Sequence, residues 1–521
     1  MCIASHFRVL LLCLICFHCV SITTASFVDT FLLLKNGSQY SLPGVTTIEF
    51  IRDDPSLLLF GTIGGSVALI RINQNQPTHY TFVKTLQEIS VGAGRSVLGI
   101  SSDPFLPHIY YISTSSFRWR QQGFPESGWQ NGKVERLLYF SRTKAISVVG
   151  SIAEGLPVSL GNGAVYGTAV DSFTSNLYVS VGTFNNGGVP SEFEGNLSDC
   201  IYSGTILEVD MKSANVSRRL EWTSDDPAAA RLKQTPEQSG ISVYAEGIRS
   251  AFTLTVSTTG ELLLFGGGAN AGRGPQSISC TESAPISVPE PDKIIRVERG
   301  RFYGHPNRAN DRCVFVSSLI SQEEARALVP DITFPLFTTQ EAIEKKIVIG
   351  SPTGSLEYTP AWFPSLRGLL MGIEEPPISG REGVPGTAAY NLQTGEITRV
   401  ADLTGVNARI DAYGSMFAAD FEGMRIKIAV PKVTKRMKRK SAVRAVWPSR
   451  GLRGSKVYIA VTGIYSRRVR FGRKRGYCER QVRRIGGVRL LTCYVPFSSF
   501  PKKLVSVQVG WQRLRKAFMV L

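Results

Sequence analysis

The chain has 521 residues, of which 43% are hydrophobic and 10% are aromatic. This composition provides for a large core and excludes a disordered or fibrous protein. The formal net charge is +18, but it is distributed unevenly, because 27 basic residues and a single acid, Glu479, lie between Arg425 and the C-terminus. We therefore expect two electrostatically different regions that join near residue 430.

The first 26 residues have the three parts of a secretory signal. Arg8 precedes an apolar run from Val9 to Val20, and small residues follow as far as Ala25 and Ser26. We predict cleavage after Ala25 or Ser26 and a secreted, extracellular protein. A membrane anchor is the alternative, but the apolar run is shorter than the roughly 20 residues that a spanning helix needs. We expect no transmembrane segment in the mature chain.

The cysteines and the glycosylation sequons fit this compartment. Removal of the leader leaves an odd number of cysteines, so at least one thiol has no intramolecular partner. These cysteines are Cys200, Cys280, Cys313, Cys478 and Cys493. Three sequons, at Asn36, Asn196 and Asn215, are compatible with N-glycosylation after secretion.

Short apolar runs bounded by Gly, Asn, Asp and Pro predict β-strands over most of the chain. Six of them begin near Leu57, Ile109, Leu177, Glu261, Gly368 and Met416. Their spacing of ~65 residues suits four-stranded blades with long loops. We expect an all-β protein with a six-bladed β-propeller, and a pair of β-sandwich domains is the alternative on pattern alone. A helix is predicted at 321–331, where Ser321 and Glu324 can form a capping box.

Residues 432–441 are strongly basic and lack apolar periodicity, so we predict an exposed linker. The sequence Arg436-Met437-Lys438-Arg439 resembles furin-type processing sites, and cleavage after Arg439 would separate the two regions. An uncut basic spacer is the alternative. Residues 442–521 contain three closely spaced apolar strands and predict one small β-sandwich.

Two longer segments carry a family resemblance. The stretch VYAEGIRSAFTLTVSTTGELLLFGGGANAG (243–272) and the stretch PDKIIRVERGRFYGHPN (291–307) resemble the soluble quinoprotein glucose and sorbosone dehydrogenase family. Further matching segments lie at 96–113, 155–183, 203–211 and 356–372. The resemblance covers about 45–431 and implies a six-bladed propeller domain, to which we assign residues 27–431.

The same resemblance implies a cofactor site made of pyrroloquinoline quinone (PQQ) and calcium. It places Arg249, Asn270, Tyr303 and His305 near the cofactor. A histidine between Gly and Pro is more often a packing residue than a base, and an arginine in a propeller mouth can equally cap strand carbonyls. His305 and Arg249 can therefore have either a cofactor-binding role or a structural role.

The resemblance also concerns the calcium ligands and the catalytic base of this site. The calcium-holding backbone carbonyls correspond to Gly268 and Ala269, and carbonyl ligands do not depend on side-chain identity. The family's catalytic base lies in a His-Asn-Gly-Gly motif, where this sequence has Gly161 in place of the histidine. No catalytic residue is assigned for this reason, and whether the protein is an enzyme stays open.

The C-terminal region resembles an IPT/TIG domain, an immunoglobulin-like sandwich. The matching segments are PSRGLRGSKVYIAVTGI, FGRKRGYCER and LLTCYVP, and the match covers 442–521. The resemblance puts Cys478 and Cys493 on facing strands and so implies a disulfide between them. Cys280 and Cys313 flank the YGHPN segment and form our second predicted pair, which leaves Cys200 free.

Two functions compete on this evidence. The favoured one is a secreted binding or adhesion module. Its basic sandwich would dock on an extracellular polyanion, such as a sulfated or acidic glycan or an anionic surface. A protein ligand is the alternative partner. The leader argues against a specific nucleic-acid partner. The alternative is a PQQ- and calcium-dependent oxidoreductase that acts on a sugar or polyol. The missing base at Gly161 favours the binding module.

Overall fold

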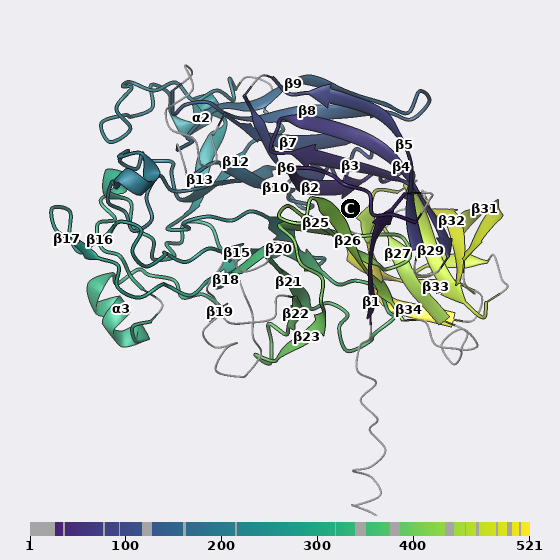
Figure 1. Cartoon of the computed structure of the whole chain (residues 1–521). Helices are drawn as coiled ribbons and strands as arrows, with labels where there is room; N and C mark the ends of the chain where they lie inside the picture. Colours follow the sequence, from purple (N-terminus) through teal and green to yellow (C-terminus); the bar gives the residue numbers. More distant parts are fainter. Residues whose placement is uncertain are drawn as a thin grey trace, which may run out of the picture.

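The computed structural model consists mostly of β-strands, as expected (Figure 1). It describes residues 27–520 with gaps at 35–36, 77–78, 93, 117–127, 160–162, 214–215, 318, 339–350, 376–385, 433–441, 454, 465–467, 486–487, 497–502 and 510–511. The leader and the predicted sites at Asn36, Gly161, Asn215 and Arg439 lie outside the described residues. Within the described part, no helix has the length and apolar character needed to cross a membrane.

Six four-stranded antiparallel units make up the first region, so the predicted propeller is confirmed. Their strands are, unit by unit, β2 (Val45–Phe50), β3 (Leu57–Thr62), β4 (Ser66–Gln76) and β5 (His79–Ser90); β6 (Ser96–Ser102), β7 (Ile109–Ser115), β8 (Gly132–Phe140) and β9 (Ala145–Leu156); β10 (Val165–Val170), β11 (Leu177–Val181), β12 (Thr205–Val209) and β13 (Ile241–Glu246); β14 (Leu254–Val256), β15 (Leu262–Gly266), β18 (Lys293–Val297) and β19 (Phe337–Thr338); β20 (Ser351–Glu357), β21 (Leu370–Glu375), β22 (Thr387–Tyr390) and β23 (Ile397–Ala401); and β24 (Asn407–Ile410), β25 (Met416–Asp420), β26 (Arg425–Pro431) and β1 (Phe27–Leu33).

The first strands of successive blades touch one another around a closed ring, in the order β2, β6, β10, β14, β20, β24 and back to β2. The N-terminal strand β1 completes the last blade, because it pairs antiparallel with β26. It also pairs with the end of β5 in the first blade. The two ends of the propeller sequence are therefore joined in one continuous sheet.

The six apolar runs found in the sequence are the second strands β3, β7, β11, β15, β21 and β25. A second strand has a hydrogen-bonded neighbour on each side, and adjacent blades cover both of its faces. Every described residue of β11, β15 and β25 is buried. This double burial explains why these strands show continuous apolar runs in place of alternation.

Helical structure is scarce among the described residues. The predicted helix is α3 (Gln322–Leu328), and Ser321 and Glu324 form the predicted capping box. Another short helix, α2 (Pro236–Ser239), precedes β13. Two 3-10 turns, η1 (Glu192–Glu194) and η2 (Arg308–Asn310), lie in the long loops, as does the hairpin of β16 (Pro275–Ser277) and β17 (Ser283–Pro285).

The C-terminal region is a β-sandwich, as predicted. Its strands are β27 (Ala442–Trp447), β28 (Arg450–Gly451), β29 (Lys456–Thr462), β30 (Val469–Phe471), β31 (Lys474–Ile485), β32 (Val488–Tyr494), β33 (Lys503–Val509) and β34 (Gln512–Val520). The strands β27, β29, β32 and β31 form one layer, and β30, β33, β34 and β28 form the other. The buried residues between the layers include Ile459, Phe471 and Phe518.

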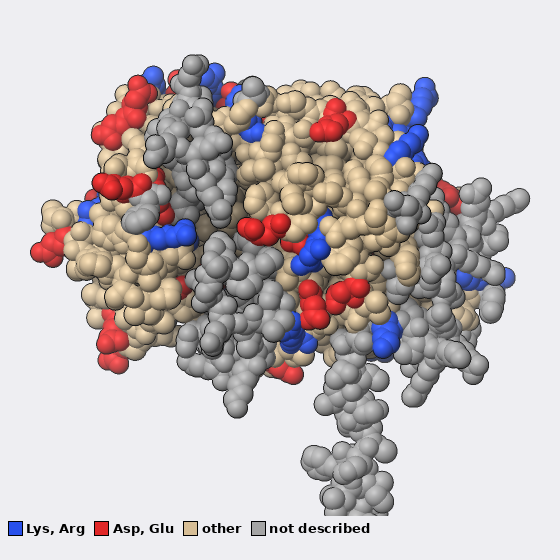
Figure 2. Space-filling model, viewed as in Figure 1, with Lys and Arg blue, Asp and Glu red and all other residues tan. Residues whose placement is uncertain are grey.

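The sandwich packs directly against the propeller. Tyr458, Ala460 and Leu490 of the sandwich belong to the same apolar cluster as Tyr358 and Trp362 of the propeller. The two parts therefore share a core, and the sandwich is not an independent module on a flexible tether. On the face shown in Figure 2, acidic and basic side chains are mixed over the propeller.

Both predicted disulfides are present. Cys280 is bonded to Cys313, and Cys478 is bonded to Cys493. Cys200 is free and buried, as expected, and burial raises the pKa of its thiol to about 12. This thiol is therefore protonated at neutral pH and unreactive. Asn196 is exposed at a turn, where a glycan has room.

Candidate functional site

The candidate site is built on the loops of the fourth blade. The turn 267–270 follows β15, and the segment 290–292 leads into β18. These two segments are joined by hydrogen bonds: the N–H of Gly268 donates to Asp292 Oδ1 (2.6 Å), and the N–H of Glu290 donates to the carbonyl of Ala269 (2.8 Å). A Cβ at Gly268 would lie 2.1 Å from the carbonyl oxygen of Glu290, so the close approach requires glycine there.

Arg249 reaches this turn from the end of the third blade. Its Nη1 donates a hydrogen bond of 2.8 Å to the carbonyl of Gly268, and the residue is only 9% exposed. The sequence left a carbonyl-capping role and a cofactor role open for this arginine. In this structure Arg249 does cap the carbonyl of the turn.

Glu194 in η1 is a buried acid in the electrostatic field of Arg249. Burial raises the pKa of Glu194 to about 7, and Asp199 adds to the rise, while the charge of Arg249 lowers it. The carboxyl group is therefore close to half protonated at neutral pH. A group with such a pKa is well matched to accepting a proton during catalysis.

Lys293 forms a buried ion pair at the start of β18. Its Nζ lies 2.6 Å from Glu290 Oε1, and the two side chains are 9% and 3% exposed. The structure shows that its charge is compensated by Glu290 and adds a second cation beside Arg249.

His305 lies in the field of both cations. It is 2% exposed, and neither ring nitrogen has a well-formed hydrogen bond among the described residues. Burial lowers the pKa of His305 well below its usual value, and the charges of Arg249 and Lys293 lower it further, against a small opposing effect of the Asn185 backbone. The imidazole is therefore neutral, and it packs edge-on against Phe315 with ring centroids 6.1 Å apart.

The other two predicted cofactor residues are engaged in structural contacts. The hydroxyl of Tyr303 donates to the carbonyl of Arg296 (2.7 Å) and accepts from the N–H of Glu298 (2.9 Å). Burial raises the pKa of Tyr303 to about 12. Asn270 exchanges hydrogen bonds with Asn186 through its backbone N–H (2.9 Å) and carbonyl (2.8 Å). The structure thus brings together Arg249, His305 and the 268–269 turn, and directs the Tyr303 hydroxyl elsewhere.

Lys293 and Tyr303 also line a cavity, which Arg249, His305 and Glu194 do not line. It has a volume of about 560 Å³, and Lys293, Tyr303, Gln322 and Thr333 are among its lining residues. A space of this size lies in the range of small-molecule sites. Lys293 therefore connects the buried charges with a cavity large enough for a monosaccharide.

Calcium at the predicted carbonyls competes with Arg249. Carbonyl oxygens suit calcium chemically, but that of Gly268 accepts the Arg249 guanidinium, and that of Ala269 accepts the N–H of Glu290. A guanidinium at this distance repels a divalent cation. The turn in this state therefore does not fit calcium, and Arg249 must leave Gly268 before the ion can bind there. Clusters of three or more His, Cys, Asp or Glu in a metal-binding arrangement are absent from the described residues.

A quinone that carries carboxylates fits the charges of the site better. Arg249 is a buried cation, and buried cations bind anionic groups strongly when water is excluded, whereas the charge of Lys293 is already compensated by Glu290. The buried ring nitrogens of His305 make no well-formed hydrogen bond within the described structure, and the ring interacts weakly with the Asn185 backbone. These features provide binding groups for an anionic cofactor.

The sequence did not single out Glu194 or Glu290. Both carboxylates come from loops, where no periodic pattern marks a residue as buried. The pairing of Glu290 with Lys293, three residues apart, was the only available signal. Glu194 carried none, because its burial depends on the tertiary contacts of the long loop between β11 and β12.

Comparison with known proteins adds the following. No family model and no curated protein matches the sequence. A solved structure described as a glucose dehydrogenase has 15% sequence identity and a TM-score of 0.47, with 77% of this chain and 98% of that chain covered. The calcium structure of a Trichoderma reesei carbohydrate-active enzyme of family AA12 has 12% identity and a TM-score of 0.47, with coverages of 79% and 99%. The holo PQQ domain of Coprinopsis cinerea pyranose dehydrogenase has 12% identity and a TM-score of 0.46, with the same coverages.

These descriptions correct our main functional expectation. They name carbohydrate-active enzymes and sugar dehydrogenases, some of them with PQQ or calcium. The prediction of a binding or adhesion module is therefore wrong. The six-bladed strand order agrees with the propeller that the sequence resemblance implies. The IPT/TIG resemblance of the sandwich stays a prediction.

Proposed function

We propose that this protein is an oxidoreductase that oxidises a hydroxyl group of a sugar or polyol and uses PQQ together with calcium. One observation carries the proposal. Two buried cations, Arg249 and Lys293, lie with a neutral His305 and a buried Glu194 of raised pKa, and Lys293 of this group lines a cavity of about 560 Å³. The family resemblance of the sequence around Arg249 and of the YGHPN turn supports it independently.

Oxidation of an alcohol to a carbonyl removes a proton from oxygen and a hydride from carbon. PQQ, when bound, supplies the two-electron acceptor for the hydride. The chain must supply the proton acceptor, and the family's histidine is replaced by Gly161. We assign this role to Glu194, since its pKa of about 7 lets it hold a proton and release it at neutral pH.

Arg249 has two alternative partners in this proposal. Without cofactor it caps the carbonyl of Gly268. With cofactor it would bind a carboxylate of the quinone and free the carbonyl for calcium. Calcium and quinone are therefore expected to bind cooperatively, because each one needs Arg249 to leave Gly268.

The test is a titration of the purified mature chain with PQQ, followed by the absorbance of the bound cofactor, with calcium or with chelator. We expect saturable binding that calcium strengthens, together with dye-linked oxidation of aldoses. Arg249→Ala should abolish the calcium effect. The matched control is Arg301→Ala, which removes an arginine whose side chain is 56% exposed. Absence of both binding and oxidation in the unaltered protein would overturn the proposal.

We propose further that the protein is secreted and glycosylated at Asn196. The leader pattern, the two disulfides and the exposed sequon support this assignment. A polyanionic partner of the basic C-terminal region stays a prediction.

A further inference from the structure

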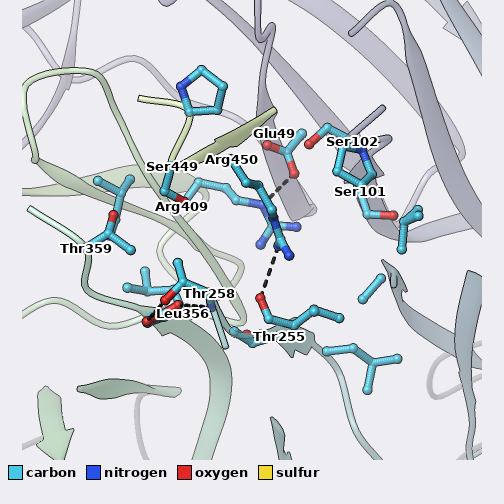
Figure 3. Close-up of a pocket in the computed structure, with 18 of the residues that line it drawn as sticks. Glu49, Ser101, Ser102, Thr255, Thr258, Leu356, Thr359, Arg409, Ser449 and Arg450 are labelled. Carbon is cyan, nitrogen blue, oxygen red and sulfur yellow. Dashed lines mark hydrogen bonds and ion pairs between the residues drawn. The ribbon is translucent and has the colours of Figure 1, made fainter. Parts of the chain in front are cut away.

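A second cavity lies where the sandwich meets the propeller, away from the candidate site. It has a volume of about 200 Å³, and Arg450 of β28 points into it (Figure 3). Arg52, which follows β2, and Arg409 of β24 also line it. Three arginines from two domains therefore meet around one small space.

Only one of these arginines has a carboxylate partner. Arg409 Nε lies 2.6 Å from Glu49 Oε2, and Arg409 also donates to the carbonyl of Ile100 (2.7 Å). Among the described residues, no carboxylate lies within ion-pair distance of Arg52 or Arg450. Arg52 donates instead to the carbonyls of Asp103 (2.7 Å) and Arg450.

Arg450 is poorly satisfied for a half-buried cation. Its Nη1 donates to Ser172 Oγ at 3.3 Å and its Nη2 to the carbonyl of Val256 at 3.1 Å, both long bonds. Desolvation and the nearby charge of Arg52 lower the pKa of Arg450 to about 10, while the charges of Glu357, Glu49 and Asp171 act in the opposite direction. None of these carboxylates forms an ion pair with Arg450, so an anion in contact with both guanidinium groups would relieve part of the cost of desolvating them.

We propose that this cavity binds a small oxoanion of the phosphate or sulfate type between Arg450 and Arg52. The planar guanidinium fork matches such anions with two parallel hydrogen bonds. Hydroxyl groups suited to donate further hydrogen bonds line the same space, on Ser102, Thr359 and Ser449. The size of the cavity admits a free ion.

The site joins the two domains. Arg450 belongs to the sandwich, whereas Arg52 belongs to the first blade. A bound oxoanion therefore stabilises the docked arrangement by mass action, since it needs both parts in place. This inference is independent of the oxidoreductase proposal.

The test uses the full mature chain. Saturable binding of radiolabelled phosphate or sulfate is measured by equilibrium dialysis, and thermal unfolding is compared in sulfate, phosphate and chloride at equal ionic strength. We expect saturable binding and a higher midpoint in the two oxoanions. Arg450→Met should weaken binding roughly 10-fold or more, because charge-assisted hydrogen bonds are lost. The control Arg453→Met, at an exposed arginine of the same segment, should bind as the unaltered chain does.

If Arg450→Met fails to fold, Arg450→Lys keeps the charge and loses the fork, and the same weakening is expected in smaller degree. A sulfated disaccharide is added as a competitor of the radiolabelled ion, to distinguish binding of a free ion from binding of an ester-linked sulfate. If the disaccharide competes as strongly as free sulfate, the assignment to a free ion is overturned. Absence of saturable oxoanion binding by the unaltered chain, or equal binding by Arg450→Met, would overturn the site itself.

Discussion

Arg249 shows how one side chain holds two loops of the propeller in place. It neutralises part of the field around Glu194 and caps the carbonyl of Gly268. Lys293 and Glu290 compensate each other nearby. The cluster is therefore electrostatically balanced without cofactor, at the cost of burying a glutamate that stays half protonated.

Glu194→Gln is expected to change how stability depends on pH. The pKa of Glu194 is raised from 4.5 to about 7, mainly by burial. The folded state then binds a proton more tightly than the unfolded state, so this group favours folding increasingly as pH falls from about 7 to 4.5. At pH 8 the glutamine variant should be more stable, by up to roughly 3 kcal/mol. Urea unfolding between pH 5 and 8 measures the difference.

The control for this experiment is Glu192→Gln, at an exposed neighbour in the same 3-10 turn. His305 acts in the opposite sense, because burial lowers its pKa and acid then favours the unfolded state. Because the parent and both variants contain His305, its contribution cancels when the stability of each variant is compared with that of the parent. A parent-to-variant difference that is constant over the whole pH range would contradict the raised pKa.

The sequence predicted only some of the individual residues of the candidate site. It identified Arg249 and the 268–269 turn, because both lie in segments with a recognisable pattern. It could not place the Tyr303 hydroxyl, since its hydrogen bonds to the backbone of Arg296 and Glu298 depend on the exact path of the loop. Buried charges on loops, such as Glu194, follow from tertiary contacts alone.

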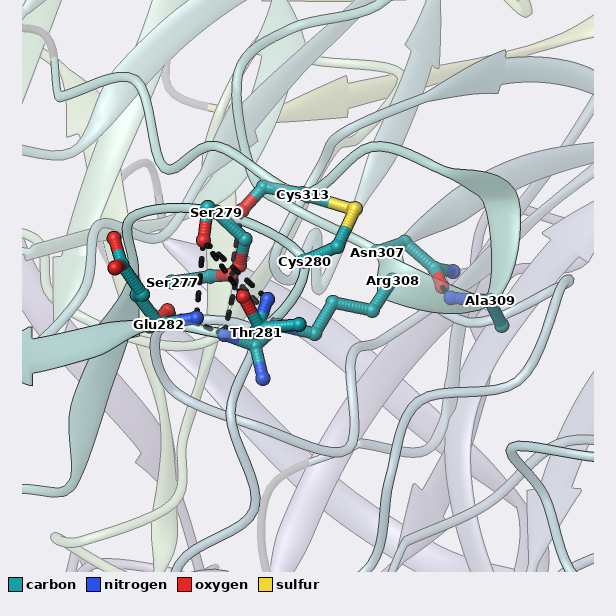
Figure 4. Close-up of a disulfide and its surroundings, with 9 residues drawn as sticks. All are labelled: Ser277, Ser279, Cys280, Thr281, Glu282, Asn307, Arg308, Ala309 and Cys313. Atoms are coloured by element: carbon teal, nitrogen blue, oxygen red, sulfur yellow. Dashed lines mark hydrogen bonds between the residues drawn. A yellow bond between two sulfur atoms is a disulfide. The ribbon is translucent and has the colours of Figure 1, made fainter.

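The long loops of the fourth blade are held by covalent and polar links. The hairpin of β16 and β17 is joined to the YGHPN loop by the disulfide between Cys280 and Cys313 (Figure 4). Arg308 adds hydrogen bonds to Ser277 Oγ (2.8 Å) and to the carbonyl of Ser279 (2.9 Å). These links fix a region that has little regular secondary structure.

Replacement of both Cys280 and Cys313 by serine should destabilise the protein by roughly 3–4 kcal/mol in the chain-entropy model, given their separation of 33 residues. The hydrogen bonds of Arg308 should keep the fold intact. Hydrogen exchange should increase in 275–285 and 303–316 first. An exchange increase confined to other blades would contradict the role assigned to this link.

The second strands of the blades were the most predictable elements. Their burial on both faces leaves a continuous apolar run in the sequence, as in β11 and β15. Outer strands such as β9 are half exposed and carry a weaker signal. The number of blades could therefore be predicted, whereas the extra hairpin and the closing strand could not.

The whole molecule behaves as one body because the sandwich and the propeller share apolar contacts. Trp447 packs edge-on against Phe50 of the first blade and contacts Tyr458 of the sandwich, with centroid distances of 6.1 and 5.7 Å. Arg444 stacks over Trp362 at 5.2 Å and accepts the Ala361 N–H with its carbonyl (2.6 Å). The charge difference between the two regions suggested separable modules, but charge patterns carry no information about apolar contacts.

Trp447→Ala is expected to lower the stability of both domains together, by about 2–4 kcal/mol, because it removes a large side chain from two apolar clusters. A calorimetric scan of the parent chain should show one transition, and the variant should unfold earlier. Tyr477→Ala is the control, since Tyr477 is 71% exposed on the same sandwich. Two separate transitions in the parent chain would contradict a shared core.

The pairing of β1 with β26 also sets an order of events during synthesis. The strand at 27–33 emerges first, yet its partner at 425–431 emerges only after all the other blades. The ring cannot close until then, and before that point β1 can pair only with the end of β5. Phe27, the residue after the expected cleavage point, packs against Phe363 with ring centroids 4.9 Å apart. The start of β1 is therefore held beside the fifth blade once the ring has closed.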